Sequence, residues 1–261
     1  MGKTMKRRIF SGAVCEQIVY SVGNGVKNLS AYDPEKVRKE RFEDAEAYRK
    51  HKENIARRNH YKKFQANFSP SSLYSTLTFS DDYEVHTFPE AKLIRKKFVR
   101  ELKKVYPDAV IFLYMGRGKG TSRIHFHMVS QGVPKEYIAD KWHYGSVVLI
   151  VNLREHNYYK GIDHGQDYAG LANYLFDHWT EEVGGHRWMQ TRNARKPDRE
   201  EPEEVKIRGG YSEKRPPIAP KGFMLVDVER TTYGYTCFKY VVIPPKHIRG
   251  KAAENTGFAT G

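Results

Sequence analysis

A chain of 261 residues with 39% hydrophobic and 13% aromatic content can bury a full core, which argues against a disordered protein. Its 45 Lys and Arg residues against 31 Asp and Glu give a net charge of +14, and nucleic acid is the commonest purposeful partner of such an excess. A basic surface that is only solvated explains the same charge.

Cysteine usage and hydropathy predict a soluble protein of the cytoplasm. Cys15 and Cys237 are far apart and belong to no metal or disulfide pattern, which fits a reducing compartment. No apolar run approaches the length that spans a membrane, and residues 1–10 lack the apolar region of a signal peptide.

The first 68 residues are predicted to form a basic, mostly helical N-terminal extension. Residues 34–64 are dense in mixed charges and indicate one long, exposed helix. Its last part, residues 56–63, is basic enough to follow a phosphate backbone, and a solvated helical face explains it equally well.

Residues 69–190 hold nearly all of the periodic patterns and are predicted to form the main domain. Apolar spacing of three or four residues predicts one helix over 87–107, where Thr87 and Glu90 stand at capping-box spacing, and a second over 166–185. Runs rich in β-branched, aromatic or other apolar residues predict the strands, at 72–79, 109–115, 124–130 and 146–153. This order predicts an α+β fold in which helices pack on a central, mainly antiparallel sheet. Beyond it, residues 191–261 are predicted to form a basic, Pro- and Gly-rich C-terminal extension with a final strand within 233–245.

Two histidines stand on either side of Phe126 in the strand predicted at 124–130. Because side chains alternate along a strand, His125 and His127 share one face, while Ile124, Phe126 and Met128 face the core. Two neutral imidazoles so placed can share a divalent metal ion with a third ligand. An incidental pair on a half-buried strand has the same pattern.

The predicted helix at 166–185 carries a tyrosine away from its apolar stripe. At roughly 100° per residue, Tyr174 lies about 120° from the centre of that stripe, with His178 one turn beyond, whereas Tyr168 belongs to the stripe. A phenol beside a metal-bound phosphate can attack phosphorus and form a covalent intermediate.

Three segments in order resemble the motifs of HUH endonucleases: "TLTF" (76–79), "HFHM" (125–128) and "DYAGLANYL" (167–175). The likeness extends from about residue 67 to 197 and is closest to the rolling-circle replication-associated (Rep) proteins of bacterial plasmids and phages. It implies a ferredoxin-like (RRM-like) nuclease core in which His125 and His127 hold Mg²⁺ or Mn²⁺. Tyr174 would then nick single-stranded DNA at a replication origin, leaving a 5′-phosphotyrosine link and a free 3′-hydroxyl that can later be rejoined. A host helicase is a further candidate partner, since the chain has no GxxxxGK[ST] motif of its own.

Two positions depart from the pattern of that family. Counting back from His125, the expected carboxylate ligand falls at Arg117, and Asp177 stands where a lysine is expected. We therefore expect His178 to be the third ligand, by likeness to single-tyrosine transposases that take it from the same turn. Three imidazoles favour Mn²⁺ or another transition metal over Mg²⁺.

Basic residues near these motifs are candidate DNA contacts, although surface solvation explains them almost as well. They are Arg117, Lys119, Arg123, Arg187, Arg192 and Arg195. Three other functions stay open: a non-catalytic nucleic-acid-binding module on the same fold, an HUH transposase or relaxase, and a metal-dependent hydrolase that uses the two histidines and a carboxylate.

Overall fold

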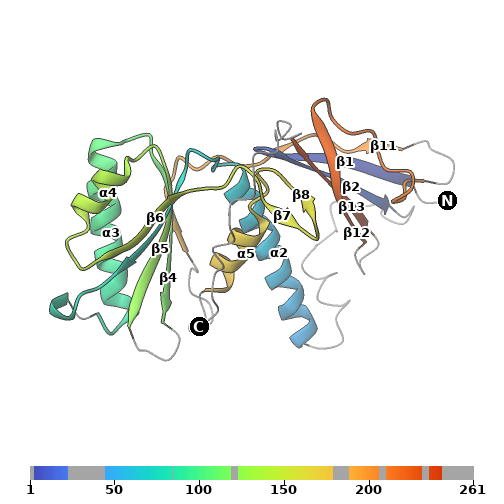
Figure 1. Cartoon of the computed structure of the whole chain (residues 1–261). Coiled ribbons are helices and arrows are strands. Elements are labelled where there is room, and N and C mark those ends of the chain that lie inside the picture. Colours follow the sequence, from blue (N-terminus) through green and yellow to red (C-terminus); the bar gives the residue numbers. More distant parts are fainter. Residues whose placement is uncertain are drawn as a thin grey trace.

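The computed structural model describes residues 3–22, 45–83, 85–118, 123–178, 188–205, 210–230 and 235–242. These residues form an α+β fold with antiparallel sheets and four α-helices. Figure 1 shows helices on both faces of one sheet and a second sheet beyond the helices of one face. Within the described residues, no helix has the length and apolar character needed to cross a membrane.

The five-stranded sheet carries the histidine strand at its centre. Its order is β6 (Val147–Asn152), β3 (Leu73–Thr78), β5 (Ile124–Gln131), β4 (Val110–Arg117) and β9 (Trp188–Gln190), and every pair is antiparallel. The expectation of a mainly antiparallel sheet is confirmed, and within this sheet the "TLTF" strand pairs with the histidine strand.

Helices α3 (Phe88–Val105) and α4 (Lys135–Lys141) pack on one face of this sheet. The capping box of α3 is present: Glu90 N–H donates to the Thr87 hydroxyl, and Thr87 N–H donates to the Glu90 carboxylate. A short 3₁₀ turn, η2 (Asp81–Tyr83), follows β3. The apolar side of β5 lies in this core, where Phe126 and Met128 are fully buried.

Helices α2 (Ala45–Gln65) and α5 (Ala169–Asp177) lie on the opposite face, the face of the histidines. The expectation of an exposed N-terminal helix is wrong for the last turns of α2, because His60, Tyr61 and Phe64 are buried there. His60 Nε2 is 2.7 Å from the Tyr114 hydroxyl of β4, a partner that sequence spacing does not reveal. The beginning of the predicted helix, residues 34–44, and the end of the tyrosine helix beyond 178 lie outside the described residues.

The N- and C-terminal extensions meet in a second sheet. Strands β1 (Lys3–Ser11) and β2 (Val14–Val22) form a hairpin, so a mostly helical N-terminal extension is wrong for these residues. The two-residue turn of this hairpin begins at Gly12, with φ 55°, where a Cβ would overlap the Gln65 carbonyl oxygen. The other strands are β10 (Asp198–Arg199), β11 (Glu203–Glu204), β12 (Phe223–Arg230) and β13 (Tyr235–Val242), the last lying within the segment expected to supply a final strand.

A small hairpin precedes the tyrosine helix. It consists of β7 (Tyr158–Tyr159) and β8 (Ile162–Asp163). Lys160 and Gly161 at its turn have φ values of 49° and 78°, as a two-residue turn with two left-handed positions requires.

Candidate metal centre and tyrosine

Three histidines from two elements come together on the face of the five-stranded sheet that α2 and α5 cover. His125 and His127 project from β5, His178 follows the last residue of α5, and one ligand nitrogen from each lies within 4.8 Å of the others. This arrangement is close enough to bind a metal ion. Among the described residues no carboxylate belongs to the cluster, so the donor set is all imidazole.

His127 is oriented by two hydroxyl groups of β3. Its Nδ1 lies 2.8 Å from the Tyr74 hydroxyl and 3.2 Å from the Thr76 hydroxyl, and its ring stacks on Tyr74 at 18° between planes. With Nδ1 engaged on this side, Nε2 points into the cluster. Such a partner on the second nitrogen is what fixes the tautomer and orientation of a metal-binding histidine.

His178 occupies the space above a glycine of the neighbouring strand. Its Nε2 is 2.7 Å from Nε2 of His125, so one of the two nitrogens carries the proton between them. Gly116 pairs with His125 across β4 and β5, and a Cβ built on Gly116 would overlap the His178 imidazole. The absence of a side chain at 116 therefore makes room for the third histidine.

The register of β4 and β5 corrects the position expected for a carboxylate ligand. Gly116, not Arg117, lies opposite His125 and on the same face, whereas Arg117 pairs with Ile124 and turns to the other face. There its guanidinium donates to the His86 carbonyl at 3.2 Å and lies over the Phe88 ring.

Tyr174 meets the cluster from α5. Its hydroxyl is 3.3 Å from Nε2 of His127, and half of the residue is exposed to solvent. Partial burial raises the pKa of the phenol above its ordinary value, so in this arrangement Tyr174 keeps its proton and can donate a hydrogen bond to Nε2 of His127. The helix thus brings a phenol hydroxyl to the rim of the cluster and leaves it partly exposed to solvent.

Burial keeps the imidazoles neutral. It lowers the pKa of His127 to about 3 and that of His178 to about 4, with a further decrease from neighbouring imidazoles, and it also lowers the pKa of His125. Neutral imidazole is the form that binds a metal, so at neutral pH the three histidines are in their metal-binding form.

We expect the metal-free protein to lose stability as the pH falls from 7 to 5. Burial also lowers the pKa of His60 to about 3, so His60 and His127 stay neutral in the folded chain while the unfolded chain takes up protons below about pH 6.5. The unfolded state then binds more protons than the folded state. For each histidine that is protonated only in the unfolded chain, the free energy of unfolding falls by about 1.4 kcal/mol per unit of decreasing pH. Urea midpoints measured at pH 7, 6 and 5 test this, and His60→Gln should reduce the dependence. A midpoint that does not change over this range would contradict the prediction.

An ion pair fixes the end of α5 beside His178. Arg57 of α2 donates to both carboxylate oxygens of Asp177, at 2.6 and 2.5 Å, and its guanidinium lies over the Phe176 ring. The Asp177 carboxylate raises the pKa of Arg57. Asp177, which stands where the resemblance expects a lysine, therefore holds the turn that carries His178.

The predicted DNA contacts do not all lie near the histidines. Arg123 precedes β5 and pairs with the Asp81 carboxylate, with both side chains exposed. Arg192 and Arg195 are exposed, but they follow β9 and lie beside the opposite end of β4, where the backbone of Arg195 bonds to Asn67. Lys119 and Arg187 lie outside the described residues.

Sequence reasoning missed the supporting residues of this centre. In the sequence, Gly116 directly follows the strand predicted at 109–115, where a glycine is common. Tyr74 is one of several aromatic residues in the predicted strands. Only strand alternation offers a signal for Tyr74, because in "LYSTLT" it shares a face with Thr76 and Thr78.

No family model, no curated protein and no solved structure matches this chain.

Proposed function

We propose that this protein is a metal-dependent single-strand DNA endonuclease and ligase that nicks by tyrosine transesterification and initiates rolling-circle replication. The observation that carries the proposal is the Tyr174 hydroxyl, 3.3 Å from a nitrogen of the three-histidine cluster. A nucleophile, a candidate metal site and an open approach are then adjacent, as phosphoryl transfer requires.

The reaction exchanges one phosphate ester for another. The Tyr174 oxygen attacks phosphorus, the bond from phosphorus to the 3′-oxygen breaks, and the products are a 5′-phosphotyrosine and a free 3′-hydroxyl. The phenol proton leaves to water, because Nε2 of His127, the nitrogen nearest to the phenol, would be engaged by the metal and so could not accept it. The 3′-oxygen takes a proton from water, and the reverse reaction rejoins the strand.

His125, His127 and His178 would hold the metal, which as a Lewis acid would polarise the scissile phosphate. The three-imidazole donor set favours Mn²⁺ over Mg²⁺. Tyr74 and Thr76 would keep His127 in the metal-binding tautomer through Nδ1, and Arg57 would hold the turn of His178 through Asp177.

The substrate class follows from the charge and from aromatic side chains on the small hairpin. Tyr158 and Tyr159 are 64% and 59% exposed beside Lys160, just before the tyrosine helix. The hairpin is braced, since His156 Nδ1 lies 2.6 Å from Asp163 and the Asn157 side chain donates to Gly165 at 2.7 Å. Exposed aromatics next to cations are typical of proteins that stack the bases of single strands.

Replacing both Tyr158 and Tyr159 with alanine is expected to weaken single-stranded DNA binding by at least roughly 5- to 150-fold, the loss expected from one stacked base. Fluorescence anisotropy with a labelled oligonucleotide measures this without any cleavage. Tyr83→Ala removes a comparably exposed tyrosine from η2 and should bind like the parent. Equal affinity in the double variant would exclude the hairpin from the DNA path.

A covalent adduct is the test of the proposed function. The protein is incubated with Mn²⁺ and 3′-labelled single-stranded oligonucleotides, and a denaturant-resistant protein–DNA complex is sought. We expect an adduct joined to the 5′ end of the downstream fragment. Binding with no adduct on any strand would indicate a non-catalytic nucleic-acid-binding module, and cleavage with no adduct would indicate a metal-dependent hydrolase.

A further inference from the structure

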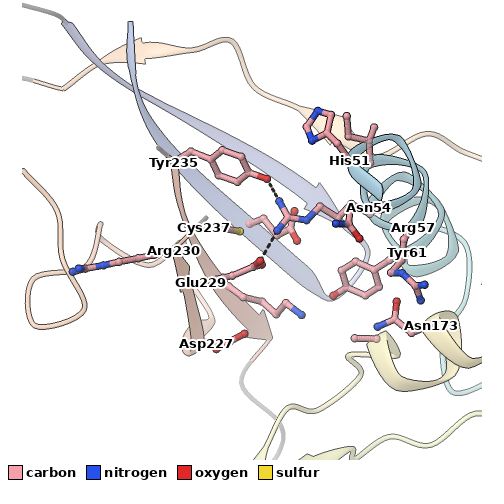
Figure 2. Close-up of a pocket in the computed structure, with 15 residues that line it drawn as sticks. His51, Asn54, Arg57, Tyr61, Asn173, Asp227, Glu229, Arg230, Tyr235 and Cys237 are labelled. Carbon is pink, nitrogen blue, oxygen red and sulfur yellow. Dashed lines mark hydrogen bonds and ion pairs between the residues drawn. The ribbon is translucent and has the colours of Figure 1, made fainter. Parts of the chain in front are cut away.

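A polar cleft of about 560 Å³ lies between α2, α5 and the second sheet. Its walls come from α2 and α5 on one side and from strands β2, β12 and β13 on the other, as Figure 2 shows for the labelled side chains. The volume is within the range of small-ligand sites and is sufficient for a nucleoside. The cleft is separate from the histidine cluster, since none of the three histidines lines it.

Most of the charged groups that line the cleft are already paired. Arg58 of α2 donates to the Tyr235 hydroxyl and to Glu229, the latter at 2.5 Å, and Figure 2 labels both acceptor residues. Lys239 lies 3.1 Å from the Asp167 carboxylate, and Glu16 lies 2.7 Å from Lys62. Because carboxylates already neutralise these cations, the cleft suits an uncharged polar ligand better than a free phosphate.

Two carboxamides supply free hydrogen-bonding capacity. Asn54 of α2 and Asn173 of α5 both line the cleft, and within the described residues neither side chain has a hydrogen-bond partner. Each amide offers donors and an acceptor, and asparagine pairs in this way with the edge of a nucleobase. The rings of Tyr61 and Tyr235 and the Arg58 guanidinium provide flat groups beside them.

The cleft and the nucleophile are joined by one helix. Asn173 directly precedes Tyr174, and consecutive side chains project about 100° apart around the helix. Between these two directions lies Gly170, where an added Cβ would meet nothing within 4 Å, so this position of α5 leaves room for a strand that crosses the helix. A nucleotide chain held at Tyr174 could therefore place a neighbouring base in the cleft.

We propose that the cleft binds an unstacked nucleobase of the DNA strand whose phosphate meets Tyr174, and that Asn54 and Asn173 set a base preference beside the nick. The link between the cleft and the nick rests on the proposed function, whereas binding of a base in the cleft does not require cleavage. One direct pair of hydrogen bonds to a base edge corresponds to a discrimination of roughly 5- to 150-fold against the wrong base.

The experiment measures sequence preference without cleavage. A Tyr174→Phe protein selects strands from a pool of randomised single-stranded oligonucleotides, and the bound strands are sequenced. The same selection is repeated with Asn54→Ala added. The matched control is Asn59→Ala, an exposed asparagine of the same helix that does not line the cleft. Asn173→Ala provides a second variant from the opposite wall.

We expect the Tyr174→Phe protein to prefer one base at one position, and Asn54→Ala and Asn173→Ala to lose that preference at the same position. Asn59→Ala should keep it. The inference is overturned if no base preference exists, if Asn54→Ala leaves it unchanged, or if Asn59→Ala removes it equally. If the base preference depends on Asn54 but the parent protein forms no adduct, the base site is retained and the nicking function is rejected. Failure of the base site and failure of the nicking function are therefore distinguishable.

Discussion

Tyr174→Phe is expected to abolish the covalent protein–DNA adduct while leaving the protein folded and able to bind single-stranded DNA. Removal of a catalytic nucleophile costs a factor of at least about 10³ in rate, and here no phosphotyrosine bond can form at all. Among the described residues the phenol of Tyr174 makes one hydrogen bond, to His127, from a half-exposed position, so its loss should have little effect on the free energy of unfolding. Adduct yield on a denaturing gel, with binding measured separately by anisotropy, checks both statements.

The chain supplies a matched control for this variant in Tyr168→Phe. Tyr168 lies immediately before the same helix but packs in the core beside Phe64, only 2% exposed, and its hydroxyl has no hydrogen-bond partner among the described residues. Removing that hydroxyl should leave both adduct formation and folding intact. If the adduct persists in Tyr174→Phe and disappears in Tyr168→Phe, the nucleophile is Tyr168 and our proposal names the wrong tyrosine.

Local periodicity was sufficient to predict which side chains of the candidate site share one face of a strand or of a helix. The alternation in "IHFHM" placed His125 and His127 on one face, and the apolar stripe of the later helix left Tyr174 and His178 off the core. The capping box of α3 was equally local, because Thr87 and Glu90 bond to each other's backbone within one turn.

Register and long-range pairing were not predictable in the same way. The number of residues in the loop after β4 does not determine which residue faces His125, and an error of one position exchanges the two faces of the strand. For this reason counting gave Arg117, although Gly116 lies on the ligand face.

The β1–β2 hairpin escaped prediction because charged and polar residues interrupt the apolar pattern of its strands. Lys6 and Glu16 interrupt the apolar pattern, and their partners, Glu203 and Lys62, are distant in the sequence. β2 also pairs with β13, whose residues lie more than 200 positions away. No local pattern contains this information.

Gly116→Ala is expected to remove His178 from the metal site, although position 116 is not a ligand. The added methyl group would overlap the His178 imidazole. Either the imidazole or the backbone of β4 must then move. The helix end can yield more easily than a central strand, so the ring should move away from His125. Changing a group that orients a ligand costs roughly 10- to 100-fold in metal affinity, and displacing a ligand should cost at least as much. Calorimetric titration with Mn²⁺ measures the loss.

Two further variants make this result specific. Gly170→Ala adds a methyl group that meets nothing within 4 Å, and it should bind Mn²⁺ as the parent does. In a His178→Ala protein the ring is already absent, so adding Gly116→Ala should cause no additional loss of affinity, and the two changes should be strongly non-additive. If Gly116→Ala weakens binding by the same factor with and without His178, position 116 acts on the site by another route. If His178→Ala binds Mn²⁺ and forms the adduct as well as the parent, His178 is not the third ligand, and the two histidines of β5 must be completed by some other group.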